Sequence, residues 1–258
     1  GKRILAKGTL LEPPHLALAA SVGCRSLRVG PRPEVSILAT GNELSGDKGR
    51  PRRGKIRDSN SILLQSLAEK LGACPHRMAP CRDSLRELIP AIRTGLASHV
   101  FLISGGVSVG KYDFVREALK REGVREIFWK VDIKPGKPFF FGKRRHTLVF
   151  GLPGNPVSVF VTFEEFVKPA LLMLQGKKQE EELVPGRMGA RFENGSRLHF
   201  VRVRCNSAKG GLRVVPLKGQ GSHMLGSLAA SNGLLKVRPY ACLRKGQQVW
   251  VKLTGEVA

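Results

Sequence analysis

The sequence is poor in aromatic residues and has no paired cysteine motif. Aromatic residues make up 6% of the 258 residues, too few for a series of platforms on which single-stranded nucleic acid could stack. The five cysteines contain no C-x-x-C pair, so we predict reduced, mostly buried thiols rather than disulfides or a metal site.

Long apolar runs are also absent. No segment is apolar over the length that a secretory signal or a membrane span requires, which predicts a cytoplasmic protein without a membrane partner. The chain begins with Gly1 rather than Met, so we expect it to be truncated at its start.

Acidic residues are scarce relative to basic ones, and the formal net charge is +24. Such an excess attracts polyanions. The basic residues are nevertheless spread over the whole chain and form no separate arm. We therefore expect no specific nucleic-acid partner, and an anionic small substrate accounts for the charge at least as well.

The middle of the chain alternates short buried-strand patterns with helical ones. The predicted strands cover 34–40, 75–80, 99–105 and 147–153, and the predicted helices cover 59–72, 84–97, 114–123 and 157–174. This alternation predicts a three-layer α/β/α domain over 34–176 with a mostly parallel sheet. In such domains ligands bind beyond the carboxyl ends of the strands.

The ends of the chain have a different texture. After the charged linker 176–182, short alternating segments separated by Gly-rich turns predict a small β-barrel or sandwich over 177–258. Residues 1–33, with a helical pattern at 16–23, are typical of the end of a domain whose main body is missing.

Two of the predicted strands are followed by glycine-containing loops. In ATGNEL (39–44), Thr40 and Gly41 offer backbone to a ligand and Glu43 offers a carboxylate, although an ordinary turn would have the same composition. In SGGVSVGKYD (104–113), Gly105 and Gly106 allow N–H groups to point at an oxyanion, close to a helix N-terminus.

The second loop nearly matches the phosphate loop of nucleoside triphosphatases, because Gly105, Gly110 and Lys111 have the required spacing. Tyr112 breaks the match, since a small hydroxyl is needed at that position for magnesium. Asp113 is either an N-cap of the following helix or a functional carboxylate.

Two further turns are rich in proline. DIKPGKP (132–138) presents Lys134 and Lys137 on a stiff turn, which suits an anion, although a solvated hairpin tip is the simpler interpretation of the segment alone. GLPGNPVS (151–158) turns sharply before Ser158 opens a helix, and it either binds an anion or serves only as a turn.

Four carboxylates occupy loops or helix starts in this scheme, namely Glu43, Asp58, Asp83 and Asp113. Each alone is more often a cap or a surface charge. Gathered beside phosphate-binding backbone, they are the oxygen ligands that Mg²⁺ prefers.

The motifs in combination resemble those of a known family. ATGNEL, RDSN (57–60), SGGVSVGKYDF, KPGKP, GLPGNPVS, GQGSHML (219–225) and ASNGLL (230–235) occur in the order found in molybdopterin molybdenumtransferases, the MoeA and gephyrin E-domain family. The resemblance extends from about Leu10 to the end of the chain and implies a pterin-binding α/β domain followed by a C-terminal β-barrel, with 1–33 as a remnant of the linking domain.

The resemblance implies a reaction and a set of site residues. The substrates would be adenylylated molybdopterin and molybdate, and AMP would leave in a magnesium-dependent step. The residues similar to the family's catalytic carboxylates are Glu43, Asp83 and Asp113, of which Glu43 and Asp113, together with Asp58, would hold Mg²⁺. The expected substrate contacts are Thr40, Gly105, Gly106, Ser108, Lys134, Lys137, Pro153, Asn155, Ser158, Arg202 and Ser222.

The resemblance also implies partners, namely a molybdopterin adenylyltransferase and, in a full-length protein, a second copy in a homodimer. Two departures stand against it. Asn42 occupies a position where the family usually has Asp, and most of the N-terminal lid and linking domains are absent. The alternative is therefore a module that binds molybdopterin, or anchors another protein, without catalysis.

Overall fold

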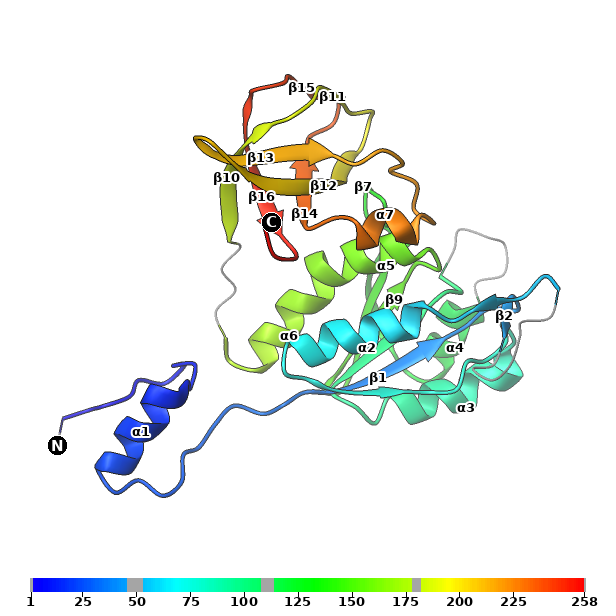
Figure 1. The fold of residues 1–258 in the computed structure, drawn as a ribbon. Helices are drawn as coiled ribbons and strands as arrows, with labels where there is room; N and C mark the ends of the chain where they lie inside the picture. The colour runs from blue at the N-terminus through cyan, green and yellow to red at the C-terminus, as the bar shows by residue number, and fades with distance from the viewer. Residues whose placement is uncertain (1, 46–52, 108–113, 178–181, 258) are drawn as a thin grey trace.

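A computed structural model describes residues 2–45, 53–107, 114–177 and 182–257. It contains an α/β unit, a β-barrel stacked on one end of it, and an N-terminal helix, α1 (Pro13–Ser21), that stands apart from both (Figure 1). Only Ala19 of α1 is buried, and Leu16 and Leu18 are exposed.

The α/β unit is built on a six-stranded sheet with the order β4-β1-β5-β9-β8-β6. The four parallel strands are β4 (Cys74–Arg77), β1 (Glu34–Ala39), β5 (Val100–Ser104) and β9 (Thr147–Leu152). Two antiparallel strands, β8 (Phe140–Arg144) and β6 (Arg125–Trp129), complete the sheet. The prediction of a mostly parallel sheet is confirmed, whereas β8 and β6 were not predicted.

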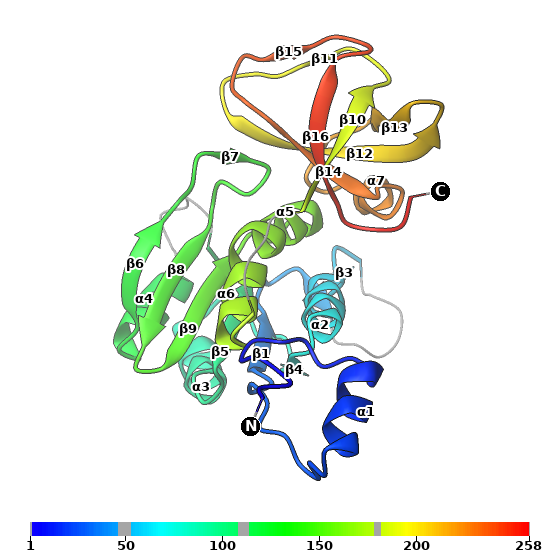
Figure 2. The same cartoon turned by 90° about the vertical axis from the view of Figure 1, so that its left-hand side faces the viewer.

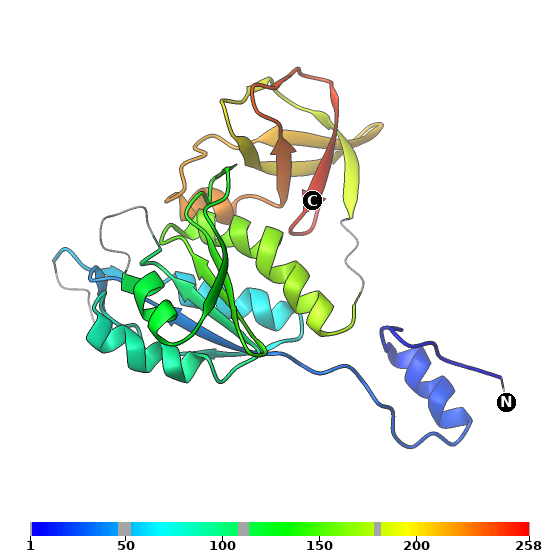
Figure 3. The ribbon, with the colours of Figure 1, turned by 180° about the vertical axis from the view of Figure 1, so that it is seen from behind.

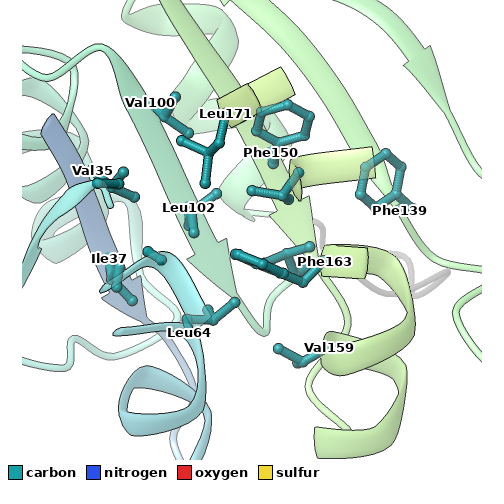
Figure 4. Close-up of a cluster of buried hydrophobic side chains, with 14 residues drawn as sticks. Val35, Ile37, Leu64, Val100, Leu102, Phe139, Phe150, Val159, Phe163 and Leu171 are labelled. Atoms are coloured by element: carbon teal, nitrogen blue, oxygen red, sulfur yellow. The ribbon is translucent and has the colours of Figure 1, made fainter. Parts of the chain in front are cut away.

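Helices cover both faces of this sheet, as predicted (Figure 2). One face carries α2 (Asn60–Lys70), α5 (Pro156–Thr162) and α6 (Lys168–Leu174), and the other carries α3 (Leu85–Gly95) and α4 (Phe114–Arg121). On the first face, Leu64 and Phe163 pack against Leu102 in a continuous apolar cluster (Figure 4). Burial of these side chains fixes the strand ends relative to the helices that follow them.

The predicted helix 157–174 is interrupted by a π-helical segment, Phe163–Val167. Pro169, the second residue after this segment, has no N–H to donate to the Glu165 carbonyl, which accounts for the irregular turn. Glu164 in this segment pairs with Lys168 at 3.1 Å and with Lys252 at 3.2 Å, so the π segment is also a charged contact with the barrel.

The barrel consists of five strands of its own, and a sixth strand, from the α/β unit, pairs with one of them. Its members are β10 (Leu183–Met188), β16 (Gln248–Leu253), β14 (Gly233–Val237), β12 (Leu198–Ala208) and β13 (Gly211–Pro216). Pairing of β12 with β13 and of β10 with β13 closes the ring, and β7 (Ile133–Lys134) of the α/β unit joins its edge at β12. The barrel therefore extends over one end of the α/β unit (Figure 3).

Small elements complete the described structure. They are β2 (Leu44–Ser45), β3 (Ile56–Arg57), α7 (Leu225–Ala229), β11 (Phe192–Glu193) and β15 (Cys242–Leu243). None of the helices described has the length and apolarity needed to span a membrane.

Candidate functional site

The carboxyl ends of β1, β5 and β9 meet at one edge of the sheet. Thr40, directly after β1, donates its backbone N–H to Ser104 O at 2.9 Å, and Gly105 N–H donates to Leu152 O at 3.1 Å. Because parallel strands end at the same edge, the loops after the three strands become neighbours. The sequence predicted a site at this place.

The loop after β1 is joined to the loop before α3 by side chains. Thr40 Oγ1 donates to Asp83 Oδ1 at 2.5 Å, and Gly41 N–H donates to Cys81 O at 3.2 Å. Burial raises the pKa of the Cys81 thiol to about 11, so this sulfur is protonated at neutral pH and is no nucleophile. Asp83 is the half-buried anion of the pair, and its carboxylate is oriented by the Thr40 hydroxyl.

Gly105 and Gly106 have backbone conformations that favour glycine, with φ of +94° and +65°. A Cβ at Gly105 would collide with the Thr40 carbonyl oxygen, and one at Gly106 would collide with Val115 and lie 3.2 Å from Asp83 Oδ1. The two glycines therefore bring this backbone close to both Thr40 and Asp83. Ser108 and Asp113, predicted in the same loop, lie outside the described residues.

The other two predicted metal carboxylates have different surroundings. The Glu43 carboxylate is exposed and folds over Gly41, whose added Cβ would lie 2.6 Å from both of its oxygens. Asp58 is 8% exposed and accepts the Ser61 N–H at 3.0 Å, so it caps α2. No group of three or more His, Cys, Asp or Glu that could hold a metal occurs among the described residues, which exclude Asp113.

The KPGKP segment is packed between the two units. Val131 N–H donates to Lys137 O at 3.1 Å, Gly136 lies against Thr162 of α5, and Lys134 pairs with His199 of the barrel through β7 and β12. The segment is thus no solvated hairpin tip, although the Lys134 and Lys137 side chains remain exposed. The backbone of both lysines therefore lies near the domain junction.

His199, beside this segment, is neutral. It is 3% exposed, and burial, together with the charges of Lys134, Arg202 and Arg197, lowers its pKa to about 4. Its Nδ1–H donates to Asn194 Oδ1 at 3.2 Å, and Nε2 is buried without a partner in the described part of the chain. The imidazole consequently adds no charge to the surrounding cations at neutral pH.

The barrel loop 219–222 contacts the start of α5. Asn155 Nδ2 donates to Ser222 Oγ at 2.9 Å, and Val157 N–H donates to Ser222 O at 3.1 Å. Arg202 is 1% exposed and holds this loop by donating from Nη2 to Gly219 O at 2.8 Å and from Nη1 to Gly221 O at 3.2 Å. Burial lowers the Arg202 pKa, and its Nε has no partner among the described residues.

Apart from Lys134 and Lys137, the predicted substrate residues that the structure describes, together with the predicted catalytic Asp83, thus fall into two neighbouring groups. Thr40, Asp83, Gly105, Gly106 and Pro153 lie at the strand ends, and Asn155, Ser158, Arg202 and Ser222 lie where α5 meets the barrel. Ser158 is 4% exposed on the first turn of α5.

Sequence reasoning did not single out Asn60, which links Ser104 to Gly154 through its side-chain amide. The sequence signal that could have identified Asn60 is its place in the RDSN motif, at the start of a predicted helix.

Known proteins resemble both units. Residues 36–173 match a family described as probable molybdopterin binding domain, and residues 178–254 match the MoeA C-terminal region, domain IV. A molybdopterin molybdenumtransferase of Haemophilus influenzae is 36% identical over 239 residues, and one of Staphylococcus aureus is 31% identical over 219 residues. The matched parts cover 90% and 84% of this chain.

Solved structures agree with these matches. A molybdopterin biosynthesis MoeA protein of Pyrococcus horikosii superposes with a TM-score of 0.83 at 28% identity, covering 97% of this chain and 61% of its own. A molybdenum cofactor biosynthesis protein of Pyrococcus furiosus gives 0.74 at 29% identity, covering 98% and 79%. This chain spans 58% and 52% of the length of the two curated relatives named above.

Proposed function

Because this chain belongs to the family of MoeA-type molybdopterin-binding proteins, we propose that it inserts molybdate into adenylylated molybdopterin with release of AMP. The observation that carries the proposal is the Thr40–Asp83 pair beside the glycine backbone at 105–106, at the ends of parallel strands. Glycine backbone at strand ends suits a phosphate-bearing ligand, and an oriented carboxylate beside it suits the Mg²⁺ that would accompany the phosphate.

The cations and the backbone would bind and orient the substrate. Exposed Lys134 and Lys137 attract an anionic pterin phosphate and a molybdate dianion to the domain junction. His199 is neutral at neutral pH, because its pKa is lowered to about 4, and it adds no charge to that attraction there. The Ser222 hydroxyl accepts from Asn155 and would donate a hydrogen bond to an oxyanion bound between the two units.

Magnesium fits this site only in part. Mg²⁺ is usually held by one or two carboxylates together with substrate phosphate oxygens, so Glu43 and Asp83 suffice if the adenylylated substrate supplies the rest. When bound, the ion would neutralise charge on the phosphate that leaves as AMP. Asp58 is the weaker candidate ligand, because one of its oxygens already accepts the hydrogen bond that caps α2.

The test is release of AMP from adenylylated molybdopterin in the presence of molybdate and Mg²⁺. We expect AMP from a full-length version of the sequence, and a strong reduction for Asp83→Ala and for Lys137→Ala. A full-length protein that releases no AMP would rule out catalysis.

The alternative function is binding of the pterin without turnover. It predicts tight pterin binding and no AMP release by these 258 residues alone. A supplying adenylyltransferase, a homodimer, a cytoplasmic location and domain boundaries after residues 33 and 176 stay predictions.

A further inference from the structure

Asn60 is the first residue of α2 and joins two loops of the candidate site. Its Nδ2 donates to Ser104 Oγ at 2.9 Å and to Gly154 O at 2.7 Å. A side-chain amide has two N–H donors, so both are in use. One side chain thus connects α2 to the end of β5 and to the loop that follows β9.

The two loops that Asn60 joins also touch each other. A Cβ added to Gly154 would lie 3.9 Å from Gly105 Cα. Ser104 is buried, and its hydroxyl points to Pro153 O across a long 3.4 Å contact. Because Asn60 donates to Ser104 Oγ, it directs the hydroxyl proton toward Pro153, and the three groups form a chain of hydrogen bonds.

We propose that Asn60 is a positioning residue that fixes the spacing between the Gly105–Gly106 backbone and the Pro153–Gly154 backbone for the pterin substrate. The inference rests on the proposed function for its substrate, while the clamp, meaning the link that Asn60 makes between Ser104 and Gly154, rests on the two hydrogen bonds of its amide. Within the RDSN motif, Asn60 would thus link two loops of the site, whereas Asp58 caps the helix that Asn60 begins.

The chemistry of the position requires an amide. Gly154 O can only accept, so it needs a donor from Asn60, and a carboxylate at position 60 would place two acceptors face to face. The Asn60 Oδ1 atom is buried and accepts no hydrogen bond from the part of the chain described. A negative charge there would have no compensating partner. Asn60→Asp should therefore lose both hydrogen bonds of the clamp, although aspartate has nearly the same shape as asparagine.

The experiment compares Asn60→Ala and Asn60→Asp with Gln65→Ala. Gln65 lies on the same helix, and its amide bonds exposed Glu69 at 2.8 Å, so the control removes an amide hydrogen bond away from the site. We expect both Asn60 variants to weaken binding of adenylylated molybdopterin, seen as Kd or KM, about tenfold or more, with a smaller change in kcat. Gln65→Ala should bind as the unaltered chain does.

Amide hydrogen exchange supplies a readout that needs no substrate. Exchange at 104–107 and at Gly154 and Asn155 should rise in both Asn60 variants, while the amides of α3 and of the barrel keep their protection. If Asn60→Ala does not fold, Asn60→Ser, which retains a smaller donor, takes its place. Unchanged exchange in folded Asn60 variants overturns the clamp, and unchanged pterin affinity overturns its positioning role. Failure of the unaltered full-length protein to bind pterin refutes the proposed function instead, and the exchange result still decides whether the clamp exists.

Discussion

The Thr40 hydroxyl donates a hydrogen bond to Asp83 Oδ1 at 2.5 Å, joining the loop after β1 to the loop before α3. A carboxylate that accepts a hydrogen bond from a fixed hydroxyl keeps one orientation, so its second oxygen points in a constant direction. Neither residue could be assigned this relationship from sequence alone, since they are 43 positions apart, with α2 and β4 between them.

Thr40→Val removes this hydrogen bond with little change in side-chain shape. A bond to a charged acceptor contributes about 1.5–3 kcal/mol, so AMP release should fall roughly tenfold to a hundredfold if Asp83 acts in catalysis. Thr40→Ser, which keeps the hydroxyl, is the control and should retain most of the rate. A Thr40→Val protein that releases AMP at the original rate would show that orientation of Asp83 is irrelevant.

Gly105→Ala tests the close approach of the glycine loop to Thr40. Alanine is strained at a φ of +94°, and its Cβ would meet the Thr40 carbonyl oxygen. We expect a loss of about 2 kcal/mol or more in the free energy of unfolding, measured by denaturant titration.

Gly226→Ala is the matched control for this change. Gly226 lies in α7, its φ is not in the left-handed region, and an added Cβ meets nothing within 4 Å. Its substitution should change stability by no more than about 1 kcal/mol, and toward greater stability. Equal effects of the two substitutions would contradict the tight packing at Gly105.

The parallel strands of the α/β unit and the loops at their ends could be predicted because their causes are local. Buried strands such as β5 read as unbroken apolar runs, and the glycines of the following loop stand beside them in sequence. The edge strand β6 was not predicted, because four of its five residues are exposed and its sequence does not alternate between apolar and polar residues. Partners that depend on tertiary contacts, such as β7 on β12, leave no local pattern.

The site residues divide in the same way. Asp58 could have been recognised as a cap, since a helix start follows it within three residues. The burial of Arg202 could not, because the carbonyls of Gly219 and Gly221 that satisfy it belong to a loop whose path the sequence does not specify. Arg202 as a direct substrate contact stays a prediction, while its described hydrogen bonds support the barrel loop.

Arg202→Met should therefore destabilise the chain as well as the site. The substitution leaves the Gly219 and Gly221 carbonyls without their donor, which we expect to cost about 2 kcal/mol net. For a chain of this length the melting temperature should fall roughly 4–8 °C. Arg204→Met, two residues along the same strand and half-buried, should change it far less. A melting temperature lowered equally by both would show that Arg202 has no special structural role.

The pH dependence of stability should report His199. Its pKa falls from 6.5 to about 4 on folding, through burial first and then through Lys134 and the neighbouring arginines, so the unfolded chain binds the proton more tightly. The contribution of neutral His199 to the free energy of unfolding is fully present above pH 6.5. It is lost progressively as the pH falls toward 4, by up to about 3 kcal/mol.

Unfolding free energies of the unaltered chain and of His199→Gln, measured from pH 7.5 to pH 4, isolate that contribution. The substitution cannot take up a proton, so the difference between the two proteins should shrink as the pH falls through this window. His146→Gln, at an exposed position, is the matched histidine control. If the difference in unfolding free energy between the unaltered chain and His199→Gln does not depend on pH, folding does not lower the pKa of His199. The conclusion that a neutral imidazole lies beside Lys134 would then be wrong.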